Sequence, residues 1–319
     1  MVLRLLLLLV LVTLAPVARA QDDALAQLLA QDARLAAMAE RLLGANAPLC
    51  RQLMPLTGMI LSSRDQYPAG IADAVFANGP VVVAQVLPGS AAQQAGVLVG
   101  DGLAAVAGSA VDPAAEGPLR DAAFAALADR WAPGTPLGLT LRRDGQERTV
   151  TLAPPTGCRA LVEIRTDAGI AGRSDGRVIQ LDLGLMQAGS DGDVAAVLAH
   201  ELGHVVLEHR RRLGAAGVAK GLAGEWGRNR RLSRLAEEEA DRISVHLLAN
   251  AGYDPSVAPA FWRSPLGRRA AGGLLRNRIY PAPRLRAEAL EAEIARLPTA
   301  RPDLAPDLLS ARDLPLAEN

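Results

Sequence analysis

Two histidines and a glutamate inside one apolar run constrain this chain most. The run from Val197 to Val206 contains an HExxH motif formed by His200, Glu201 and His204. On an α-helix the two histidines lie one turn apart on the same face, so both imidazoles can reach one zinc ion while Glu201 points to the water that zinc activates. The motif therefore predicts a helix with a metallopeptidase-type zinc site, although the pattern can also arise by chance on an ordinary buried helix.

Length and charge limit the classes of protein to consider. The chain has 319 residues, of which 50% are hydrophobic, so it can bury one large core or two ordinary ones, and we expect two domains. Lysine plus arginine number 34, as do aspartate plus glutamate. This balance argues against a globally basic nucleic-acid binder and against a protein with an acidic tail.

Residues 1–20 have the pattern of a secretory signal peptide. Arg4 is followed by an apolar run from Leu5 to Leu14 and by a small-x-small cleavage site that ends at Ala20. The alternative is an uncleaved membrane anchor, but the run is shorter than the roughly 20 residues that a spanning helix needs. We therefore expect a periplasmic or secreted protein that keeps no stable membrane span after cleavage.

The chain contains two cysteines, Cys50 and Cys158. Export would place them in an oxidising compartment, where a disulfide can persist. The alternative is a pair of separate buried thiols. A bridge between them would close the base of whatever domain the intervening residues form.

The first half of the mature chain changes character near residue 67. Residues 21–66 are predicted to form an N-terminal helix of the main core and a linker, with Gly44 as the helix stop. The apolar residues at helical spacing are Leu25, Leu28, Leu29, Leu35, Met38 and Leu42. Residues 67–155 instead show short β segments with turn signals, including a hairpin that turns at Asp144 and Gly145.

The stretch VVVAQVLPGSAAQQAGVLVGDGLAAVAG, which begins at Val81, resembles a bacterial PDZ domain. The resemblance covers about residues 67–155 and implies binding of extended peptides, often C-termini, by strand addition beside the long helix expected near Leu119 to Trp131. A clear Gly-Leu-Gly type loop for a carboxylate is missing between Pro68 and Gly79. A degenerate PDZ-like domain that acts as a spacer or lid is therefore the alternative.

Two histidines leave a zinc ion short of a third protein ligand. The best candidate lies in LAEEEADR, which begins at Leu235 on a second predicted helix. This stretch resembles the ExxAD motif of the HtpX-type and CAAX-prenyl-protease-type zinc metallopeptidases, a gluzincin family, and AGYDP from Ala251 resembles another segment of that family. The resemblance makes Glu237 the third ligand. It also places Asp241 where it could accept a hydrogen bond from a ligand histidine.

That resemblance covers residues 22–50 loosely and 158–297 well, and it sets our expected fold. We expect an α+β protein in which a mainly helical, zincin-like core with a small β-sheet spans residues 156–297. The PDZ-like domain is inserted into this core, and residues 298–319 form a mobile tail. Strands are predicted at Ala160–Arg165 and Arg177–Leu183. The resemblance implies that the second strand is the edge on which a peptide substrate lies.

Other polar residues near the motifs are assigned by helical spacing and by the resemblance. The first zinc helix is expected to begin near Ser190 and to run to about Arg212, which would turn His209 away from the ligands, and spacing turns His246 away from Glu237. We expect Glu238, Glu239 and the run Arg210 to Arg212 to be solvated. Family members often carry a histidine followed six residues later by an arginine. Here Tyr280 replaces the histidine and Arg286 keeps the arginine, so these two are our candidates for stabilising the oxyanion.

These observations predict a zinc endopeptidase of the cell envelope that holds one Zn²⁺ per chain. Glu201 would act as the base, and the PDZ-like domain would present or gate protein or peptide substrates. The alternative from another class is an envelope protein-binding or assembly factor with a closed, mainly structural zinc site. A metal-free pseudoenzyme is disfavoured because all three proposed ligands and Glu201 are present. The physiological substrate and the oligomeric state are left open.

Overall fold

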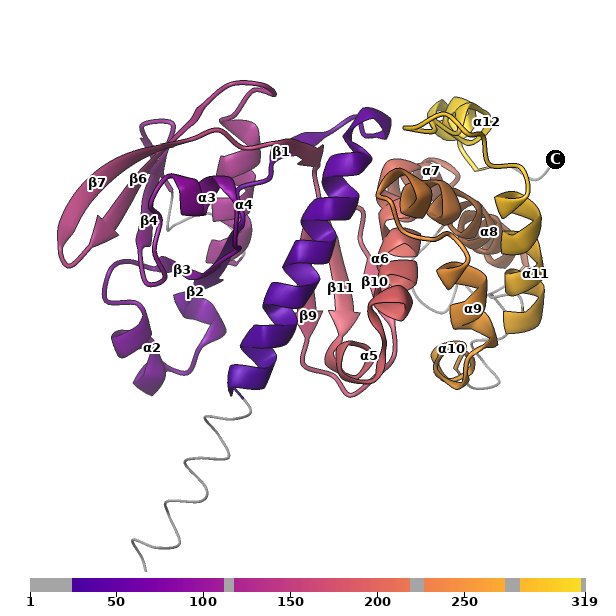
Figure 1. Ribbon diagram of the computed structural model, residues 1–319, viewed down its shortest axis with the longest axis horizontal. Coiled ribbons are helices and arrows are strands. Elements are labelled where there is room, and N and C mark those ends of the chain that lie inside the picture. Colours follow the sequence, from indigo (N-terminus) through magenta and orange to yellow (C-terminus); the bar gives the residue numbers. More distant parts are fainter. Residues whose placement is uncertain (1–24, 112–117, 219–226, 273–281, 317–319) are drawn as a thin grey trace, which may run out of the picture.

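The computed structural model describes residues 25–111, 118–218, 227–272 and 282–316. The expected signal peptide at residues 1–20 and Tyr280 lie outside these ranges. Residues 25–45 form a helix whose Leu35, Met38 and Leu42 are buried, as their spacing predicts. Figure 1 shows this helix between a β-rich unit on one side and a mainly helical unit on the other.

The β-rich unit is built on a sheet of order β2-β3-β4-β6-β7, with β5 paired to β4. Its strands are β2 (Met59–Ser63), β3 (Val81–Val86), β4 (Gly102–Val106), β5 (Ser109–Ala110), β6 (Leu137–Arg143) and β7 (Gln146–Leu152). Its helices are η2 (Arg64–Gln66), α2 (Ala69–Val75), α3 (Ala91–Gln94) and α4 (Leu119–Asp129). The β6–β7 hairpin is confirmed, and alternate leucines of β6 enter a hydrophobic core that belongs to this unit. Its relation to PDZ domains stays a prediction.

A short ladder closes the base of the β-rich unit. After η1 (Ala47–Leu49), strand β1 (Leu53–Pro55) pairs antiparallel with β8 (Thr156–Cys158). Cys158, the last residue of β8, forms a disulfide with Cys50, with a Cα–Cα distance of 5.4 Å and a sequence separation of 108. The disulfide prediction is therefore confirmed. The unit leaves and rejoins the rest of the chain at one covalently closed point.

The helical unit contains a small sheet of order β10-β11-β9. Strand β9 (Leu161–Arg165) runs parallel to β11 (Val178–Asp182), and β10 (Gly172–Ser174) pairs antiparallel with β11. The two predicted strands are confirmed, but the second is central and not an edge. The edge strand β10 was not expected, because its three residues, Gly-Arg-Ser, show no apolar alternation.

Helices surround this sheet and complete the core. They are α5 (Leu183–Ala188), α6 (Asp191–Val206), α7 (His209–Ala215), α8 (Gly227–Asn250), α9 (Val257–Arg263), α10 (Pro265–Ala270), α11 (Pro283–Ile294), α12 (Pro306–Ser310) and η5 (Ala311–Asp313). The sheet lies between the N-terminal helix and α6, with α8, α9 and α11 beyond α6 (Figure 1). One continuous hydrophobic cluster joins the N-terminal helix, the sheet, α6 and α8. The α+β class is as expected.

Helix α6 is shorter than we predicted. It begins at the expected cap, where Ser190 Oγ accepts a hydrogen bond from the amide of Asp193 and the Asp193 carboxylate accepts one from the amide of Ser190. It ends at Val206, because Glu208 adopts a left-handed conformation with φ of 53°. The chain then restarts as α7 in a new direction. This break changes where the residues of α7 point, His209 among them.

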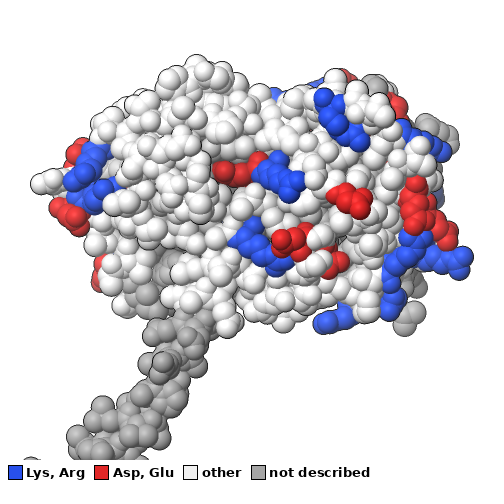
Figure 2. All heavy atoms as spheres, viewed as in Figure 1, with Lys and Arg blue, Asp and Glu red and all other residues white. Residues whose placement is uncertain are grey.

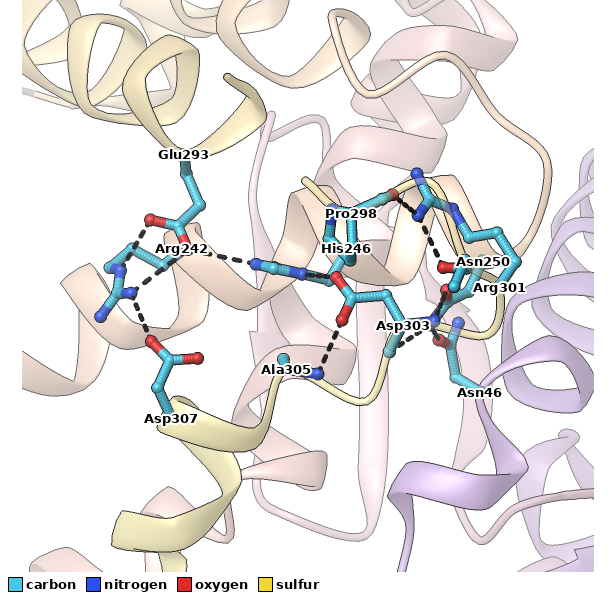
Figure 3. A network of polar contacts seen from close by, with 11 residues as sticks. Asn46, Arg242, His246, Asn250, Glu293, Pro298, Arg301, Asp303, Ala305 and Asp307 are labelled. Carbon is cyan, nitrogen blue, oxygen red and sulfur yellow. Dashed lines mark hydrogen bonds and ion pairs between the residues drawn. The ribbon is translucent and has the colours of Figure 1, made fainter. Parts of the chain in front are cut away.

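The C-terminal segment is packed, which corrects our expectation of a mobile tail. Asp303, Ala305, Leu308 and Leu316 are all buried. Figure 3 shows how polar contacts fix the segment: Asp303 and the amide and carbonyl of its backbone face His246 and Asn250 of α8. A buried carboxylate is costly unless it is paired, and the buried imidazole supplies that partner. The segment is therefore part of the fold through at least residue 316.

His246 belongs to this tail network and not to the zinc motifs. Its Nε2 lies 3.1 Å from Glu293 Oε1, and Arg242 donates to both oxygens of Glu293 and to Asp307. The network in Figure 3 thus joins α8, α11 and the start of α12. Our expectation that His246 is not one of the ligands agrees with this placement.

The surface carries a mixed charge. On the face drawn in Figure 2, basic and acidic side chains are interspersed over a mostly uncharged surface, as the equal numbers of the two kinds lead one to expect. Among the described helices, none has the length and apolar character needed to cross a membrane.

We predict that the Cys50–Cys158 bridge contributes substantially to stability. It closes a loop of 108 residues, so replacing Cys50 by Ser together with Cys158 by Ala should lower the free energy of unfolding by about 4 kcal/mol. Urea unfolding of the two proteins measures this difference. Reductant should destabilise the wild type and leave the double variant unchanged. Two freely alkylated thiols in the unreduced wild type would contradict the prediction.

Candidate metal centre

A pocket of about 510 Å³ opens beside the HExxH helix. Its lining includes His200, Glu201 and His204 of α6, Glu237 of α8, and the whole of β10. The structure therefore brings together the residues predicted from the HExxH motif and from the ExxAD-like stretch, although these two motifs are far apart in the sequence.

The metal-binding atoms of three residues converge at one point of this pocket. His200 Nε2 lies 3.3 Å from His204 Nε2 and 3.1 Å from Glu237 Oε2, and His204 Nε2 lies 3.6 Å from Glu237 Oε1. Zinc bound tetrahedrally to nitrogen and oxygen at 2.0 to 2.1 Å requires its ligands to be about 3.3 Å apart. The three residues form a possible metal site whose donor set and spacing fit zinc.

Close packing of α8 on α6 brings Glu237 to the histidines. A Cβ atom on Gly203 would lie 2.8 Å from Ile243 Cγ2 and 3.1 Å from the carbonyl oxygen of Ala240. The glycine between the two motif histidines therefore has no room for a side chain. Its absence lets the helices approach until the Glu237 carboxylate reaches the imidazoles.

Asp241 orients His200, as expected from the resemblance. Its Oδ1 lies 2.9 Å from His200 Nδ1, which leaves Nε2 of that ring facing the ligand point. Arg286 in turn donates from Nε and Nη2 to the two oxygens of Asp241, both at 2.6 Å. The guanidinium also lies over the ring of Trp262, with 3.6 Å between Cζ and the ring centroid.

The position of Arg286 corrects the role that we expected for it. Its side chain is 4% exposed, and two of its nitrogens hold Asp241 in a bidentate pair. Such a pair fixes the carboxylate behind His200, so Arg286 acts through Asp241 and not as a donor aimed at an oxyanion. The corresponding expectation for Tyr280 lies outside the described residues and stays a prediction.

Glu201 lies between α6 and the edge strand. It is buried and lines the pocket beside the ligands. A Cβ atom on Gly172 of β10 would lie 2.8 Å from both Cγ and Oε1 of Glu201, and 2.7 Å from Val197 Cγ1. The missing side chain at Gly172 therefore lets β10 pass directly over the Glu201 carboxylate.

Sequence spacing missed a group of residues on the far side of His204. His209 is buried with its Nδ1 2.9 Å from His204 Nδ1, and its Nε2 lies 3.0 Å from Glu239 Oε2. Arg212, also buried, pairs with Glu239. We expected Glu239 and Arg212 to be solvated, and this was wrong because α6 stops at Val206. Glu238 is exposed as expected and pairs with Arg234.

Burial and neighbouring charges set the protonation of the three ligands. Burial lowers the pKa of His204 to about 3, so this ring is neutral. Burial opposes the charge of Glu237, but the neighbouring His204, His200 and Arg286 together outweigh it and lower its pKa to about 2. Burial also opposes charge on His200, yet Asp241 and Glu237 outweigh it and raise its pKa to about 10. Without a metal, the site thus holds a proton on His200 between two carboxylates.

We predict that zinc affinity rises with pH. Zinc requires a neutral imidazole, and below a pKa of about 10 it must displace the proton of His200, whereas His204 and Glu237 are already deprotonated above a pH of about 4. Between pH 6 and 8 the association constant should therefore rise about tenfold per pH unit. Calorimetry in buffers of different ionisation enthalpy should detect the release of about one proton. A pH-independent affinity would show that His200 is neutral in the metal-free protein.

We also predict that Gly172→Ala loosens the contact between β10 and α6. The added Cβ overlaps Val197 and Glu201, so stability should fall by about 1 to 3 kcal/mol in urea unfolding. Gly138→Ala is the matched control, because that strand glycine has open space at its Cβ position and no positive φ. Equal effects of the two changes would mean that β10 is not tightly packed on Glu201.

Comparison with known proteins agrees with this geometry. Residues 160–223 match the model of Peptidase family M48, and this segment contains the HExxH helix but ends before Glu237. The mitochondrial metalloendopeptidase OMA1 of Arabidopsis thaliana is 34% identical over 126 residues, which cover 32% of this chain and 24% of that protein. The chain thus spans about a quarter of the length of this relative. The chain is thus similar to Peptidase family M48 over the segment that holds the HExxH helix, and to part of a mitochondrial metalloendopeptidase.

Proposed function

We propose that this protein is a zinc-dependent endopeptidase of the cell envelope with one zinc ion per chain. The observation that carries the proposal is the convergence of His200, His204 and Glu237 on one point of a pocket that Glu201 also lines. Zinc held by these three residues would supply a Lewis acid for the scissile carbonyl and would lower the pKa of a water molecule from that of bulk water toward about 7.

The chain's own residues divide the remaining chemistry. Glu201 takes a proton from the attacking water and passes it to the leaving amine. Asp241, held by Arg286, keeps His200 in the orientation that its role as ligand requires. Tyr280 is the proposed donor to the developing oxyanion, as the resemblance to HtpX-type and CAAX-prenyl-protease-type enzymes suggests.

Strand β10 is the proposed platform for the peptide. The amide of Asp182 donates to the carbonyl of Ala171, and the amide of Asp175 donates to that of Val178. Because pairing alternates along an antiparallel ladder, the backbone groups of Arg173 face β11, whereas those of Gly172 and Ser174 point away from it. An extended substrate could add to this edge as a further strand, directly beside Glu201. The strand proposed to bind the substrate is therefore β10 and not β11.

The β-rich unit is proposed to present or gate substrates. Its long helix α4 faces the helical unit, since Arg120 pairs with Glu163 of β9 and Asp129 pairs with Arg159. This arrangement suits a spacer or lid as well as a PDZ-like peptide binder. Export to the envelope is supported by the Cys50–Cys158 bridge, since disulfides persist in oxidising compartments. An assembly factor with a closed zinc site is less well supported, because the pocket reaches the ligands.

We predict that Glu201→Gln retains zinc and loses hydrolysis. Gln cannot accept the proton, so cleavage of casein should fall by about 10² to 10⁴-fold while metal analysis still finds about one zinc per chain. Glu238→Gln changes an exposed glutamate of α8 and should leave cleavage unaltered. A chelator should abolish wild-type cleavage and added zinc should restore it.

Two outcomes would count against this function. Unchanged turnover in the Glu201→Gln protein would remove Glu201 from the mechanism. A zinc-loaded wild type that cleaves no unfolded substrate, yet co-purifies with an envelope protein, would favour the assembly factor.

A further inference from the structure

A second line of buried polar contacts runs from His204 away from the pocket. His204 Nδ1 lies 2.9 Å from His209 Nδ1, and His209 Nε2 lies 3.0 Å from Glu239 Oε2. Arg212 donates to both oxygens of Glu239 and, from Nε, to the carbonyl oxygen of Leu314 at 3.1 Å. The line thus begins at a proposed zinc ligand and ends on the backbone of the C-terminal segment.

If zinc is bound, the chemistry of imidazole fixes which ring nitrogens in this line donate and which accept. Nε2 of His204 is the nitrogen at the ligand point, so it must offer a lone pair to zinc and the proton must sit on Nδ1. Nδ1 of His209 must then accept a hydrogen bond from the Nδ1–H group of His204, so the proton of His209 sits on Nε2. That Nε2–H group faces Glu239, which accepts it. Every donor meets an acceptor when zinc is bound.

The groups in this line depend on one another for hydrogen bonds because they are buried. His209 and Arg212 are each 2% exposed, so water is a poor substitute for either group. If His209 could not accept, the Nδ1–H group of His204 would be left buried without a partner, which costs about 1 to 3 kcal/mol. Rotation of the ring would relieve that cost and would also move Nε2 away from the ligand point.

The backbone explains why His209 is in this place. On an uninterrupted helix it would face away from the ligands, but the left-handed residue Glu208, with φ of 53°, ends α6 and redirects the chain. A non-glycine residue in this conformation costs on the order of 1 kcal/mol and persists where the surrounding structure fixes it. Here the redirected turn places an imidazole behind His204.

We propose that His209 and Glu239 are positioning residues that hold His204 in the tautomer and orientation that zinc requires, with Arg212 fixing Glu239. The proposal rests on the zinc site of the proposed function. It goes beyond that function because it assigns His204 a support different from that of His200. The outer nitrogen of His200 contacts the Asp241 carboxylate directly. The outer nitrogen of His204 instead contacts the neutral ring of His209, which in turn contacts the Glu239 carboxylate.

The primary test measures zinc and not cleavage. The purified full chain is loaded with zinc, and the rate of transfer to a chelator and the zinc dissociation constant are measured. Loss of contacts behind a ligand typically weakens metal binding by about 10 to 100-fold, which is the effect expected for His209→Leu. Glu239→Gln should weaken binding by about tenfold. Glu238→Gln, which changes the exposed neighbour, should match the wild type.

A rescue variant separates positioning from folding. In His209→Asn, the side-chain oxygen can occupy the place of Nδ1 and accept from His204, so zinc should be released more slowly than from His209→Leu. Unfolding of each metal-free protein reports any general loss of stability. Nitrogen-15 NMR of the zinc-loaded, histidine-labelled wild type should show a slowly exchanging Nδ1–H on His204, and this signal should be lost in His209→Leu.

The outcomes separate this proposal from the proposed function. If the wild type binds zinc but His209→Leu and Glu239→Gln release it at the wild-type rate, the positioning role is wrong and the zinc site stands. An unprotonated Nδ1 on His204 in the zinc-loaded wild type would also overturn it. If the wild type binds no zinc, the proposed function itself fails. Variants that change zinc release in a protein without peptidase activity would support the positioning role alone.

Discussion

The close approach of α8 to α6 at Gly203 is the constraint on which the site depends. With no side chain at this position, α6 comes within contact distance of Ala240 and Ile243, and acidic residues of α8 can then reach both motif histidines. Glu237 meets the ligand point, and Asp241, one turn later, meets the outer nitrogen of His200. One helix–helix contact thus places both Glu237, a proposed metal ligand, and Asp241, which holds the proposed ligand His200.

The same contact buries several charges, and their arrangement explains why a cation suits the site. Asp241 is neutralised by the bidentate Arg286, whereas Glu237 pairs with the imidazoles of His200 and His204. A buried carboxylate without a firm counter-charge is costly. A proton on His200 supplies one positive charge, and a divalent ion coordinated by all three groups would supply more. Binding of a cation would therefore also offset the cost of burying the Glu237 carboxylate.

The sequence predicts those features that depend on local spacing or on a recognisable motif. His200 and His204 follow from the helical repeat, and Glu237 follows from the family resemblance. The contacts behind His204 were missed because they depend on the backbone conformation of Glu208, and no glycine or proline marks a break there. Once the helix was assumed to continue, His209 had to face the wrong way. The three-residue strand β10 was missed because so short a segment shows no periodicity.

The C-terminal segment shows how distant parts of the chain determine the surroundings of a local motif. Its residues look irregular in sequence, yet Asp303 completes a buried pair with His246 and the carbonyl of Leu314 receives Arg212. Neither partner can be deduced from spacing, because each lies on a different helix. The carbonyl of Leu314 accepts a hydrogen bond from Nε of Arg212, and the two Nη groups of Arg212 donate to Glu239. Packing at the end of the chain therefore affects the contacts behind His204, a proposed metal ligand more than 100 residues earlier in the sequence.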